Sequence, residues 1–452
     1  MRRLALIVLA LAAFTGAASG APQPPGPLTA FVVAGGGWGH GVGMSQWGAY
    51  GQAKAGRSYQ QILGYYYRGT ELGNAPASLL EKVRVLVRGD LGSVSVSSSA
   101  PIVVIDAGGK RYRLDATLTV EPKLELPVGK AGAVVPLTGP LTLRPAADAN
   151  LVFGGKAYRG ELQLTKIDGR LQLVNALGLE AYLLGVVPGE MPKHWPLEAL
   201  KAQAVAARTY AVAHLAKGKS YDLFSDYRSQ LYYGVGAEAS GPSQAVRETR
   251  GQILTYEGRA AQTLYFSSSG GHTISALDAF GWNIPYLVAV DDPWDETSPN
   301  HAWTAQLLNG SELGKKFGLQ GAVVDVTYVP GTPGKPAVVR LTTADGVAKE
   351  VRLSDVRGRL GLKSTGFRLG LLRLDRPATV ANGVLTLTGV ARDVADPVLE
   401  QRVAGGGWVL VKRLTTGANG AFSVKLKLSS TTVYRLASGE LGGPPLAVRV
   451  AA

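Results

Sequence analysis

Apolar positions in residues 176–217 repeat with the period of an α-helix. The repeated positions are Leu197, Leu200, Ala204, Ala207, Ala211 and Leu215. Their spacings of three and four residues predict one apolar helix face. Because most of these residues are alanines, a neighbouring element must approach the face closely. We expect Lys201, Gln203 and Arg208 to point away from it.

Alternation of apolar and polar residues dominates the chain from residue 82 to residue 175. Val83, Val85 and Val87 follow this pattern, and glycine or proline interrupts it at short intervals, which predicts short β-strands. Residues 375–452 again contain short strands separated by turn residues, which predicts a small immunoglobulin-like β-sandwich. The expected fold class is therefore α+β, with a β-rich domain around one long central helix and then the all-β sandwich.

The first residues have the pattern of a secretory signal peptide, which we expect to span residues 1–21. The first three residues include two arginines, residues 4–14 are apolar and residues 16–21 are small. The apolar run is too short to anchor the mature chain across a bilayer. After cleavage, a proline-rich linker (residues 22–30) would begin a protein that is secreted or held in the cell envelope, without a membrane span. An uncleaved N-terminal anchor is the alternative.

Composition narrows the possible partners. The 452-residue chain has 47 basic and 33 acidic residues, hence a formal charge of +14, which favours an anionic partner such as the acidic polymers of a bacterial wall. No lysine- or arginine-rich run is present, so we expect no nucleic-acid binding. The lack of cysteine excludes disulfides, thiolate metal sites and a cysteine nucleophile.

A glycine-dense stretch begins at residue 35 and must form loops or tight turns, and residues 45–67 then carry a helical pattern. Glycine-rich loops can hold phosphates. This one lacks the Gly-Lys-Ser/Thr ending of a P-loop and the preceding strand of a dinucleotide-binding fold. We therefore expect no nucleotide binding.

One carboxylate, Glu190, lies between two prolines shortly before the predicted helix. Pro188 fixes its own φ and Pro192 disfavours a helical Met191, so we expect Glu190 on a stiff, non-helical turn. A catalytic acid gains from such a rigid mount. On residue types and spacing alone, an ordinary solvated loop glutamate is the alternative.

The stretch LEAYLLGVVPGEMPKHWPLEALKAQAVAARTYAVAH closely resembles the stage II sporulation protein D (SpoIID) family, which includes the amidase enhancers. The supporting stretches are SQLYYG at 229–234, FSSSGGH at 266–272, Pro285-Tyr286-Leu287 with Asp291 and Asp292 after it, and GWGHGVGMSQWGAYGQAKAGRSYQQILGYYYRGTEL near the N-terminus. The resemblance covers most of residues 31–374 and implies a β-rich part at 82–175 and a catalytic region at 176–345.

The order of these motifs differs from that of the family. There the GHGVGMSQ stretch usually follows the catalytic region, whereas here it comes first, within residues 31–74, and residues 359–368 resemble the piece that normally leads into it. The resemblance thus implies a circular permutation, which chains tolerate when their termini lie close together. We expect residues 35–72 to fold back against residues 186–290 in a monomer. Docking into a second molecule, as a swapped dimer, is the alternative.

The resemblance implies a lytic transglycosylase that acts on the glycan strands of peptidoglycan. Glu190 would protonate the leaving glycosidic oxygen and then, as a carboxylate, take a proton from the sugar's own 6-hydroxyl, which gives a 1,6-anhydro product. A second carboxylate is not needed, unlike in ordinary glycosidases. A partly apolar site near Trp195 or Tyr210 would raise the pKa of Glu190 by disfavouring its charged form.

Candidates for substrate binding come from the same motifs. They are Gln203, Arg208, Tyr210, Gln230, Ser267, Ser268, Ser269, Gly270, His40, Ser45 and Gln46. The alternatives are a helix-covering role for Gln203 and Arg208, a tight turn for the serine loop, and a structural hydrogen-bond hub for His40. If a second catalytic carboxylate exists, the candidates are Asp291, Asp292 and Asp295. Loop or helix-capping roles are favoured for all three.

We expect no cofactor and no metal. Some members of the family hold zinc through cysteine-containing sites, which this chain lacks, and its five histidines include no pair at helical metal spacing. The resemblance leaves a non-catalytic function open, because amidase enhancers bind wall polymer and stimulate a partner amidase. In that function Glu190 would be incidental. A third interpretation is a structural component of the cell surface.

Overall fold

The computed structural model describes residues 26–128, 133–215, 218–376, 378–381, 383–402 and 406–449. The predicted signal peptide and most of the proline-rich linker lie outside these residues. Within the described part, no helix has the length and apolar character needed to cross a membrane.

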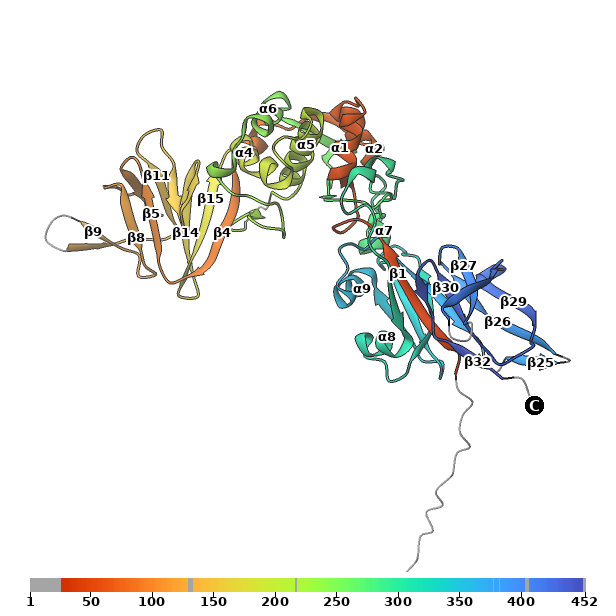
Figure 1. Ribbon diagram of the computed structural model, residues 1–452. Coiled ribbons are helices and arrows are strands. Elements are labelled where there is room, and N and C mark those ends of the chain that lie inside the picture. Colours follow the sequence, from red (N-terminus) through yellow and green to blue (C-terminus); the bar gives the residue numbers. More distant parts are fainter. Residues whose placement is uncertain are drawn as a thin grey trace, which may run out of the picture.

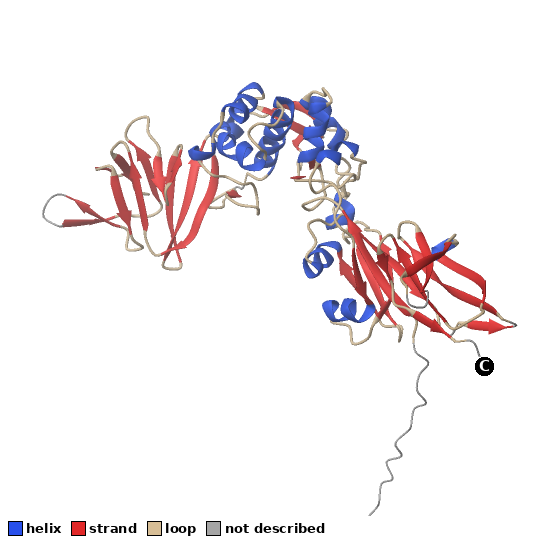
Figure 2. Ribbon diagram, viewed as in Figure 1, coloured by secondary structure: helices blue, strands red, loops and turns tan. Residues whose placement is uncertain are grey.

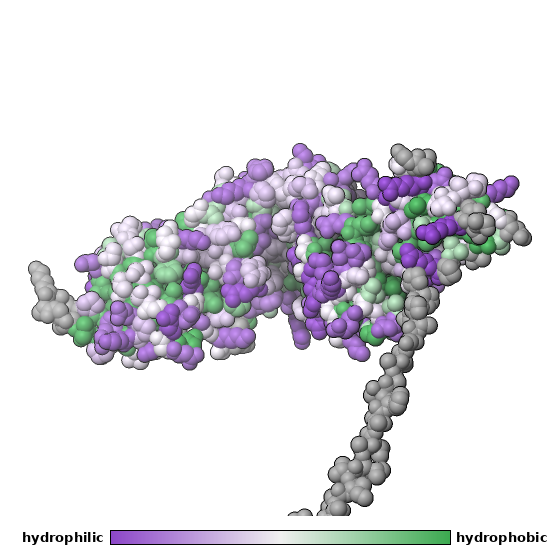
Figure 3. Space-filling view, turned by 60° about the horizontal axis from the view of Figure 1, so that its bottom comes forward, coloured by the Kyte–Doolittle hydropathy of each residue, from purple (hydrophilic) through white to green (hydrophobic). Residues whose placement is uncertain are grey.

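The chain forms an arch, with a β-rich lobe at each end and helices between them (Figures 1 and 2). Strands predominate over helices, so the expected β-rich α+β class is confirmed. Seen from below the arch, the surface is hollowed between the two lobes (Figure 3).

The first β-lobe spans residues 83–177, as the alternating pattern predicts. Its strands are β4 (Val83–Leu91), β5 (Val94–Ser98), β6 (Ile102–Ile105), β7 (Arg111–Leu114), β8 (Thr117–Val120), β9 (Glu125–Val128), β10 (Ala133–Pro136), β11 (Leu141–Pro145), β12 (Leu151–Phe153), β13 (Lys156–Tyr158), β14 (Glu161–Ile167) and β15 (Arg170–Leu177), joined by the later β16 (Leu223–Phe224). The larger sheet has the order β16-β4-β15-β14-β11-β6-β7, and a second has the order β13-β12-β5-β8. Val83 and Val85 are completely buried, so alternate residues form the core.

The helical middle is built around α5 (Leu197–Ala213), the helix that the apolar repeat predicts. Its neighbours are α1 (Gln46–Lys54), α2 (Tyr59–Tyr66), α4 (Leu179–Glu190), α6 (Ser240–Glu248) and β17 (Gln252–Tyr256). The alanines let these elements approach closely, and α5 is buried around most of its circumference. The expectation that Gln203 and Arg208 point away from an apolar face is therefore wrong, because both side chains are completely buried.

Shorter elements complete the middle of the molecule. They are β2 (Met44–Ser45), β3 (Glu71–Asn74), α3 (Ala77–Leu80), η1 (Val235–Ala237), β18 (Arg259–Ala260), β19 (Tyr265–Phe266), α7 (Ala276–Phe280) and η2 (Pro293–Thr297). β17 lies between β3 and β18 in one small sheet, which joins the N-terminal segment to the helical core.

The segment around Glu190 is helical, contrary to the expected turn. α4 continues through Pro188 and ends at Glu190. Pro188 lies in the last turn, where its missing N–H removes a single hydrogen bond. Met191 precedes a proline and is extended (φ −126°, ψ 147°), so the helix stops there and Glu190 is mounted on a helix end.

The N-terminal glycine-rich segment docks against the middle, as the permutation hypothesis predicts. β2 pairs in parallel with β19, and Trp38 pairs with Ser268. The stretch that follows residue 359 lies beside the docked segment, where the Gly39 N–H donates to the Lys363 carbonyl at 3.1 Å. Two stretches that are far apart in sequence are thus neighbours in space.

The second β-lobe contains the N-terminal strand β1 (Leu28–Gly35), which lies between β24 (Phe367–Leu374) and β20 (Gln306–Asn309) (Figure 1). The other elements are α8 (Gly310–Phe317), β21 (Val323–Val329), β22 (Val338–Thr343), β23 (Ala348–Arg352), α9 (Leu353–Leu360), β25 (Thr379–Ala381), β26 (Val384–Arg392), β27 (Pro397–Arg402), β28 (Trp408–Arg413), η3 (Ala418–Gly420), β29 (Ala421–Lys427), β30 (Thr432–Ser438), β31 (Leu441–Gly442) and β32 (Leu446–Val448). Phe31 enters the core formed with α8 and α9, whereas Val32 enters the core of the C-terminal strands. β1 therefore joins two cores.

The C-terminal strands form two sheets. One has the order β20-β1-β24-β26-β25, with β29 paired to β26, and the other has the order β28-β27-β30-β31, with β32 paired to β30. The expected boundary at residue 375 falls between β24 and β26, which are neighbours in the same sheet. The C-terminal strands thus share a sheet with the N-terminal strand.

Gly48 of α1 marks a close approach within the docked segment. A Cβ atom at this position would lie 2.0 Å from Tyr66 Oη and 2.4 Å from Asp292 Oδ2. We predict that Gly48→Val lowers the free energy of unfolding by about 1–3 kcal/mol, because overpacking forces the buried neighbours apart. Urea denaturation followed by circular dichroism measures the change.

Gly64→Ala in α2 is the matched control. A Cβ atom there meets nothing within 4 Å, and alanine is the better helix former, so the stability should stay equal or rise. If Gly48→Val were as stable as the unchanged protein, the close docking of α1 would be contradicted.

The docking contacts join parts of one chain, so we predict that the mature protein is a monomer. Size-exclusion chromatography with light scattering should give the mass of a single chain at every concentration tested. A dimer that persists on dilution would favour the swapped arrangement.

Candidate functional site

Glu190 lies where α4 meets three other segments. Its Oε1 accepts a hydrogen bond from the Leu231 N–H at 2.7 Å. The Tyr265 hydroxyl on β19 and the Gln46 side chain at the start of α1 also hydrogen-bond to this carboxyl. The expected site residue Gln46 is therefore brought to Glu190 by the docked N-terminal segment.

Two glycines explain how Leu231 comes so close to α4. Gly185 and Gly189 are four residues apart, on one face of the helix. A Cβ atom at Gly189 would lie 3.0 Å from the Leu231 carbonyl, and one at Gly185 would lie 2.7 Å from the ring of Tyr232. The missing side chains let the 231–233 segment lie flat on α4, which places the Leu231 N–H at the carboxyl.

Burial raises the pKa of Glu190 to about 7, and the hydrogen bonds from Leu231, Tyr265 and Gln46 offset part of that effect. Burial disfavours the charged form, whereas donors to the carboxylate favour it. The carboxyl is therefore populated in both protonation states near neutral pH, so it is suited both to donate and to accept a proton.

A second layer of polar groups orients the groups that contact Glu190. Gln230 Nε2 donates to Tyr265 Oη at 3.0 Å, and Gln230 Oε1 accepts from Tyr182 Oη at 3.1 Å. Gln46 Nε2 donates to Gln203 Oε1 at 3.3 Å. Gln203 and Gln230 are both buried. Gln203 is connected to Glu190 through Gln46, and Gln230 is connected to it through Tyr265.

The predicted aromatic neighbours take different positions. Tyr210 is partly buried, stacks on His214 with ring centroids 4.0 Å apart, and has its pKa raised by burial and, to a smaller extent, by the charge of Glu190. Trp195 is buried and packs against Trp47 and Tyr50 of α1. Trp195 therefore helps to hold the docked segment.

His40 is a hydrogen-bond hub, as its structural interpretation predicts. Its Nδ1 accepts from the Val42 N–H at 3.1 Å, so Nε2 carries the proton and donates to the Tyr265 carbonyl at 3.0 Å. Burial lowers the pKa of His40 to about 4, so the ring is neutral. This geometry does not favour the expected contact of His40 with substrate, because both ring nitrogens are hydrogen-bonded to backbone groups.

The serine loop at residues 267–270 is turned toward the protein interior. The donors around Asp295 include Ser45 Oγ at 3.0 Å, Ser268 Oγ at 2.9 Å, and the N–H groups of Ser269 and Gly270 at 3.0 Å each. Ser269 Oγ donates to Asp292 Oδ2 at 2.8 Å. The hydroxyls of Ser45, Ser268 and Ser269 are thus engaged internally, which corrects their expected sugar-binding role. Ser267 stays partly exposed.

The three candidate aspartates have structural partners. Asp292 and Asp295 are completely buried and bind the docked segment. Burial raises the pKa of Asp292 to about 6, with a smaller contribution from Asp295. Asp291 is exposed and accepts from His272 Nδ1 at 2.8 Å. Among the described residues, no group of three histidine or acidic side chains could hold a metal ion.

Arg208 belongs to the framework. Its guanidinium forms two 2.8 Å hydrogen bonds with Glu180 at the start of α4, and a further one with the Gln252 carbonyl at 3.2 Å. The side chain is completely buried. Arg208 was expected to contact substrate. Instead, its buried side chain links α5 to α4 and β17.

Sequence reasoning missed Tyr265, Leu231 and Tyr182. Leu231 contributes a backbone N–H, which no residue type reveals. Tyr265 directly precedes the FSSSGGH motif. Its contacts with Gln230 and Glu190 depend on the folded structure and are not visible in the sequence. The signal that was available is the Gly185–Gly189 pair, whose spacing predicts a closely approached helix face.

Comparison with known proteins finds similar sequences around α4 and α5. A family model described as "Stage II sporulation protein" matches residues 167–256. A stage II sporulation protein D from Bacillus amyloliquefaciens is 36% identical over 213 residues, which cover 43% of this chain and 60% of that protein. An uncharacterized protein of Brachyspira hyodysenteriae is 41% identical over 141 residues (30% and 38%).

An amidase enhancer from Bacillus subtilis is 39% identical over 125 residues, which cover 28% of this chain and 17% of that protein. The chain thus spans less than two thirds of the length of each of these relatives. No solved structure gives a significant match. The matched region contains α4, Glu190 and α5, and over this region the chain is similar to stage II sporulation protein D and to an amidase enhancer.

Proposed function

We propose that this protein is an exported lytic transglycosylase that cleaves the glycan strands of peptidoglycan, with Glu190 as its general acid and base. The observation that carries the proposal is a partly buried carboxyl, hydrogen-bonded from three sides, with a pKa of about 7. One group that must donate and then accept a proton needs both forms near the working pH. The family match around Glu190 supports the choice of substrate.

In the proposed first step, protonated Glu190 gives its proton to the glycosidic oxygen while the bond from that oxygen to C1 breaks. The sugar left behind has oxocarbenium-ion character. In the second step, the carboxylate takes the proton of the same sugar's 6-hydroxyl, and the freed oxygen bonds to C1. The products are a 1,6-anhydro end and a new hydroxyl end, and Glu190 is protonated again.

Between these steps Glu190 is charged, and its neighbours determine how stable that state is. The Leu231 N–H and the hydroxyl of Tyr265 donate to the carboxylate and stabilise it. Burial acts in the opposite direction. The balance keeps the carboxylate basic enough to take a proton from a sugar hydroxyl that is already attacking C1.

Stimulation of a wall amidase is the second candidate function, because one matched relative is named an amidase enhancer. Under that proposal the protein binds wall polymer, and Glu190 does no chemistry. Both proposals place the protein in the cell envelope, which the signal-peptide pattern and the net charge of +14 support. A Glu190 variant separates them.

We predict that Glu190→Gln loses about 10²–10⁴-fold in glycan-cleavage rate, the usual contribution of a general acid or base. Glutamine keeps the shape and can still accept from Leu231, so folding should be unaffected. Mass spectrometry of products from purified glycan strands measures anhydro ends. Glu296→Gln, at an exposed position of η2, is the matched control and should cleave normally.

If Glu190→Gln released the same fragments at the same rate, the transglycosylase proposal would fail. If neither protein cleaved glycan but both stimulated a wall amidase equally, the enhancer proposal would stand. Reducing ends in place of anhydro ends would indicate a hydrolase.

The pH dependence of cleavage should report the protonation of Glu190. Only the protonated carboxyl of the free enzyme can start the reaction, and its pKa is about 7. We predict that kcat/KM is level below about pH 6 and falls about tenfold per pH unit well above pH 7. A midpoint near 4.5, the ordinary value for glutamate, would contradict the proposed environment.

A further inference from the structure

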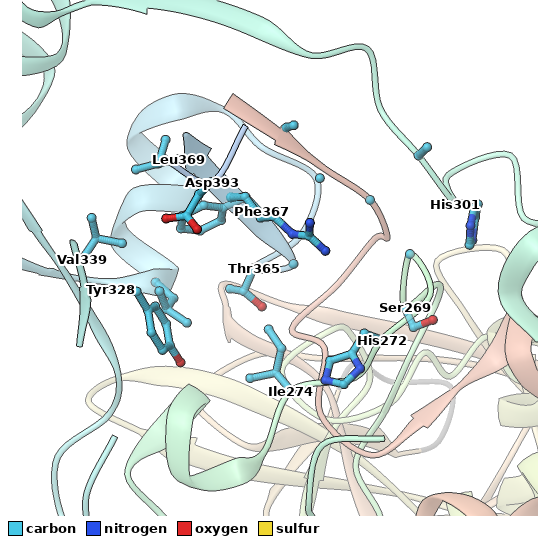
Figure 4. A pocket seen from close by; sticks show the side chains of 18 of the residues that line it. Ser269, His272, Ile274, His301, Tyr328, Val339, Thr365, Phe367, Leu369 and Asp393 are labelled. Carbon is cyan, nitrogen blue, oxygen red and sulfur yellow. The ribbon is translucent and has the colours of Figure 1, made fainter. Parts of the chain in front are cut away.

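A cavity of about 620 Å³ lies where the docked segment meets the second β-lobe (Figure 4). Its lining combines residues 34–36 at the end of β1, two loops at 269–274 and 301–302, and residues of β21, β22, α9 and β24. Glu190 and the groups that contact it are not part of this lining. A volume of this size suits a small-molecule or short-peptide ligand.

One wall of the cavity is apolar. It is lined by Ile274, Val326, Val339, Leu353, Phe367 and Leu369. Branched aliphatic side chains with one aromatic ring accept small apolar groups well and offer no hydrogen bonds. This wall comes from two distant parts of the chain, since Ile274 follows the serine loop and the others belong to the second β-lobe.

The polar side chains of the lining include Arg368, which is exposed and permanently charged. In Figure 4, His272 and His301 lie on the side of Ser269, while Asp393 lies across the cavity near Phe367. An arginine in a partly enclosed, apolar cavity favours a carboxylate ligand, because its planar fork of N–H groups matches two carboxylate oxygens.

The two histidines are held in defined orientations. His272 Nδ1 bonds to Asp291 Oδ1 at 2.8 Å, and His301 Nδ1 bonds to Asp295 Oδ2 at 3.3 Å. Each carboxylate accepts, so each Nδ1 carries a proton and each ring has its Nε2 left for a ligand. In the tautomer with the proton on Nδ1, Nε2 accepts from N–H or O–H groups of a ligand rather than from a carboxylate.

We infer that this cavity binds the carboxyl-terminal end of a short peptide with small apolar side chains. The terminal carboxylate pairs with Arg368, peptide N–H groups donate to the imidazole Nε2 atoms, and the side chains contact the apolar wall. Asp393 on the far side disfavours a second carboxylate there. The choice of a wall-type peptide as probe rests on the proposed function, since peptidoglycan carries short peptides on its glycan strands.

The test is isothermal titration of the full mature chain with N-acetyl-D-alanyl-D-alanine, its C-terminal amide, and octanoate. The free acid should bind, and the amide should bind at least about tenfold more weakly, because the charge-assisted pair with Arg368 is lost. Arg368→Gln should weaken binding of the acid by a similar factor. Octanoate tests whether a fatty acid, which shares the carboxylate but lacks peptide N–H groups, is preferred.

Two further variants keep the test interpretable. Arg413→Gln changes an exposed arginine of β28 away from the cavity and should bind the acid normally. Ala302→Trp places a bulky side chain at an exposed position of the lining and should abolish binding without touching the core. Equal binding of acid and amide, an unchanged affinity in Arg368→Gln, tighter binding of octanoate, or no binding of the acid would each overturn the inference.

Failure of this inference and failure of the proposed function are distinguishable. Glu190→Gln should still bind the dipeptide, because Glu190 is not in the lining. Arg368→Gln should still cleave bare glycan strands that carry no peptide. Loss of dipeptide binding in Glu190→Gln would contradict the separation of the two sites.

Discussion

Two buried aspartates hold the arch together at its centre. Asp292 and Asp295 accept hydrogen bonds from Ser45 of the N-terminal segment, from Tyr66 of α2, and from the serine loop. A buried carboxylate is costly unless its oxygens are satisfied, so each aspartate stabilises only the arrangement in which the segment is docked. The physical constraint is local: the donors must be present, whichever end of the sequence supplies them.

The site around Glu190 depends on that docking. Gln46 follows Ser45 directly and contacts Glu190, while His40 binds the carbonyl of Tyr265, whose hydroxyl also contacts Glu190. Burial raises the pKa of the carboxyl, and the donors lower it again by a smaller amount. A displaced segment would remove donors and let water reach the carboxyl, so the protonation of Glu190 is coupled to the position of a segment more than a hundred residues away in sequence.

The sequence was informative where a feature depends on local periodicity or on a recognisable motif. The helix at α5, the β-rich class and the return of residues 35–72 to the segment of residues 186–290 follow from such patterns, whereas the role of Glu190 stays a proposal. The helical backbone at Pro188 was missed, because proline is compatible with the end of a helix and only Pro192 determines where it stops.

The roles of buried polar residues could not be predicted. Arg208 was expected at the substrate but pairs with Glu180 inside the protein, and Ser268 and Ser269 serve aspartates that follow them by more than twenty residues. Residue type and spacing do not reveal which distant partner a polar side chain meets. Tyr265 was missed for the same reason, although it contacts the proposed catalytic carboxyl.

The fold holds Glu190 in a partly buried environment, where burial raises the pKa of its carboxyl to about 7. The most direct measurement is an NMR titration of the ¹³C-labelled side-chain carboxyl of Glu190 in the mature protein, assigned with Glu190→Gln. We expect a midpoint near pH 7. A midpoint near 4.5, the ordinary value for a solvated glutamate, would contradict it.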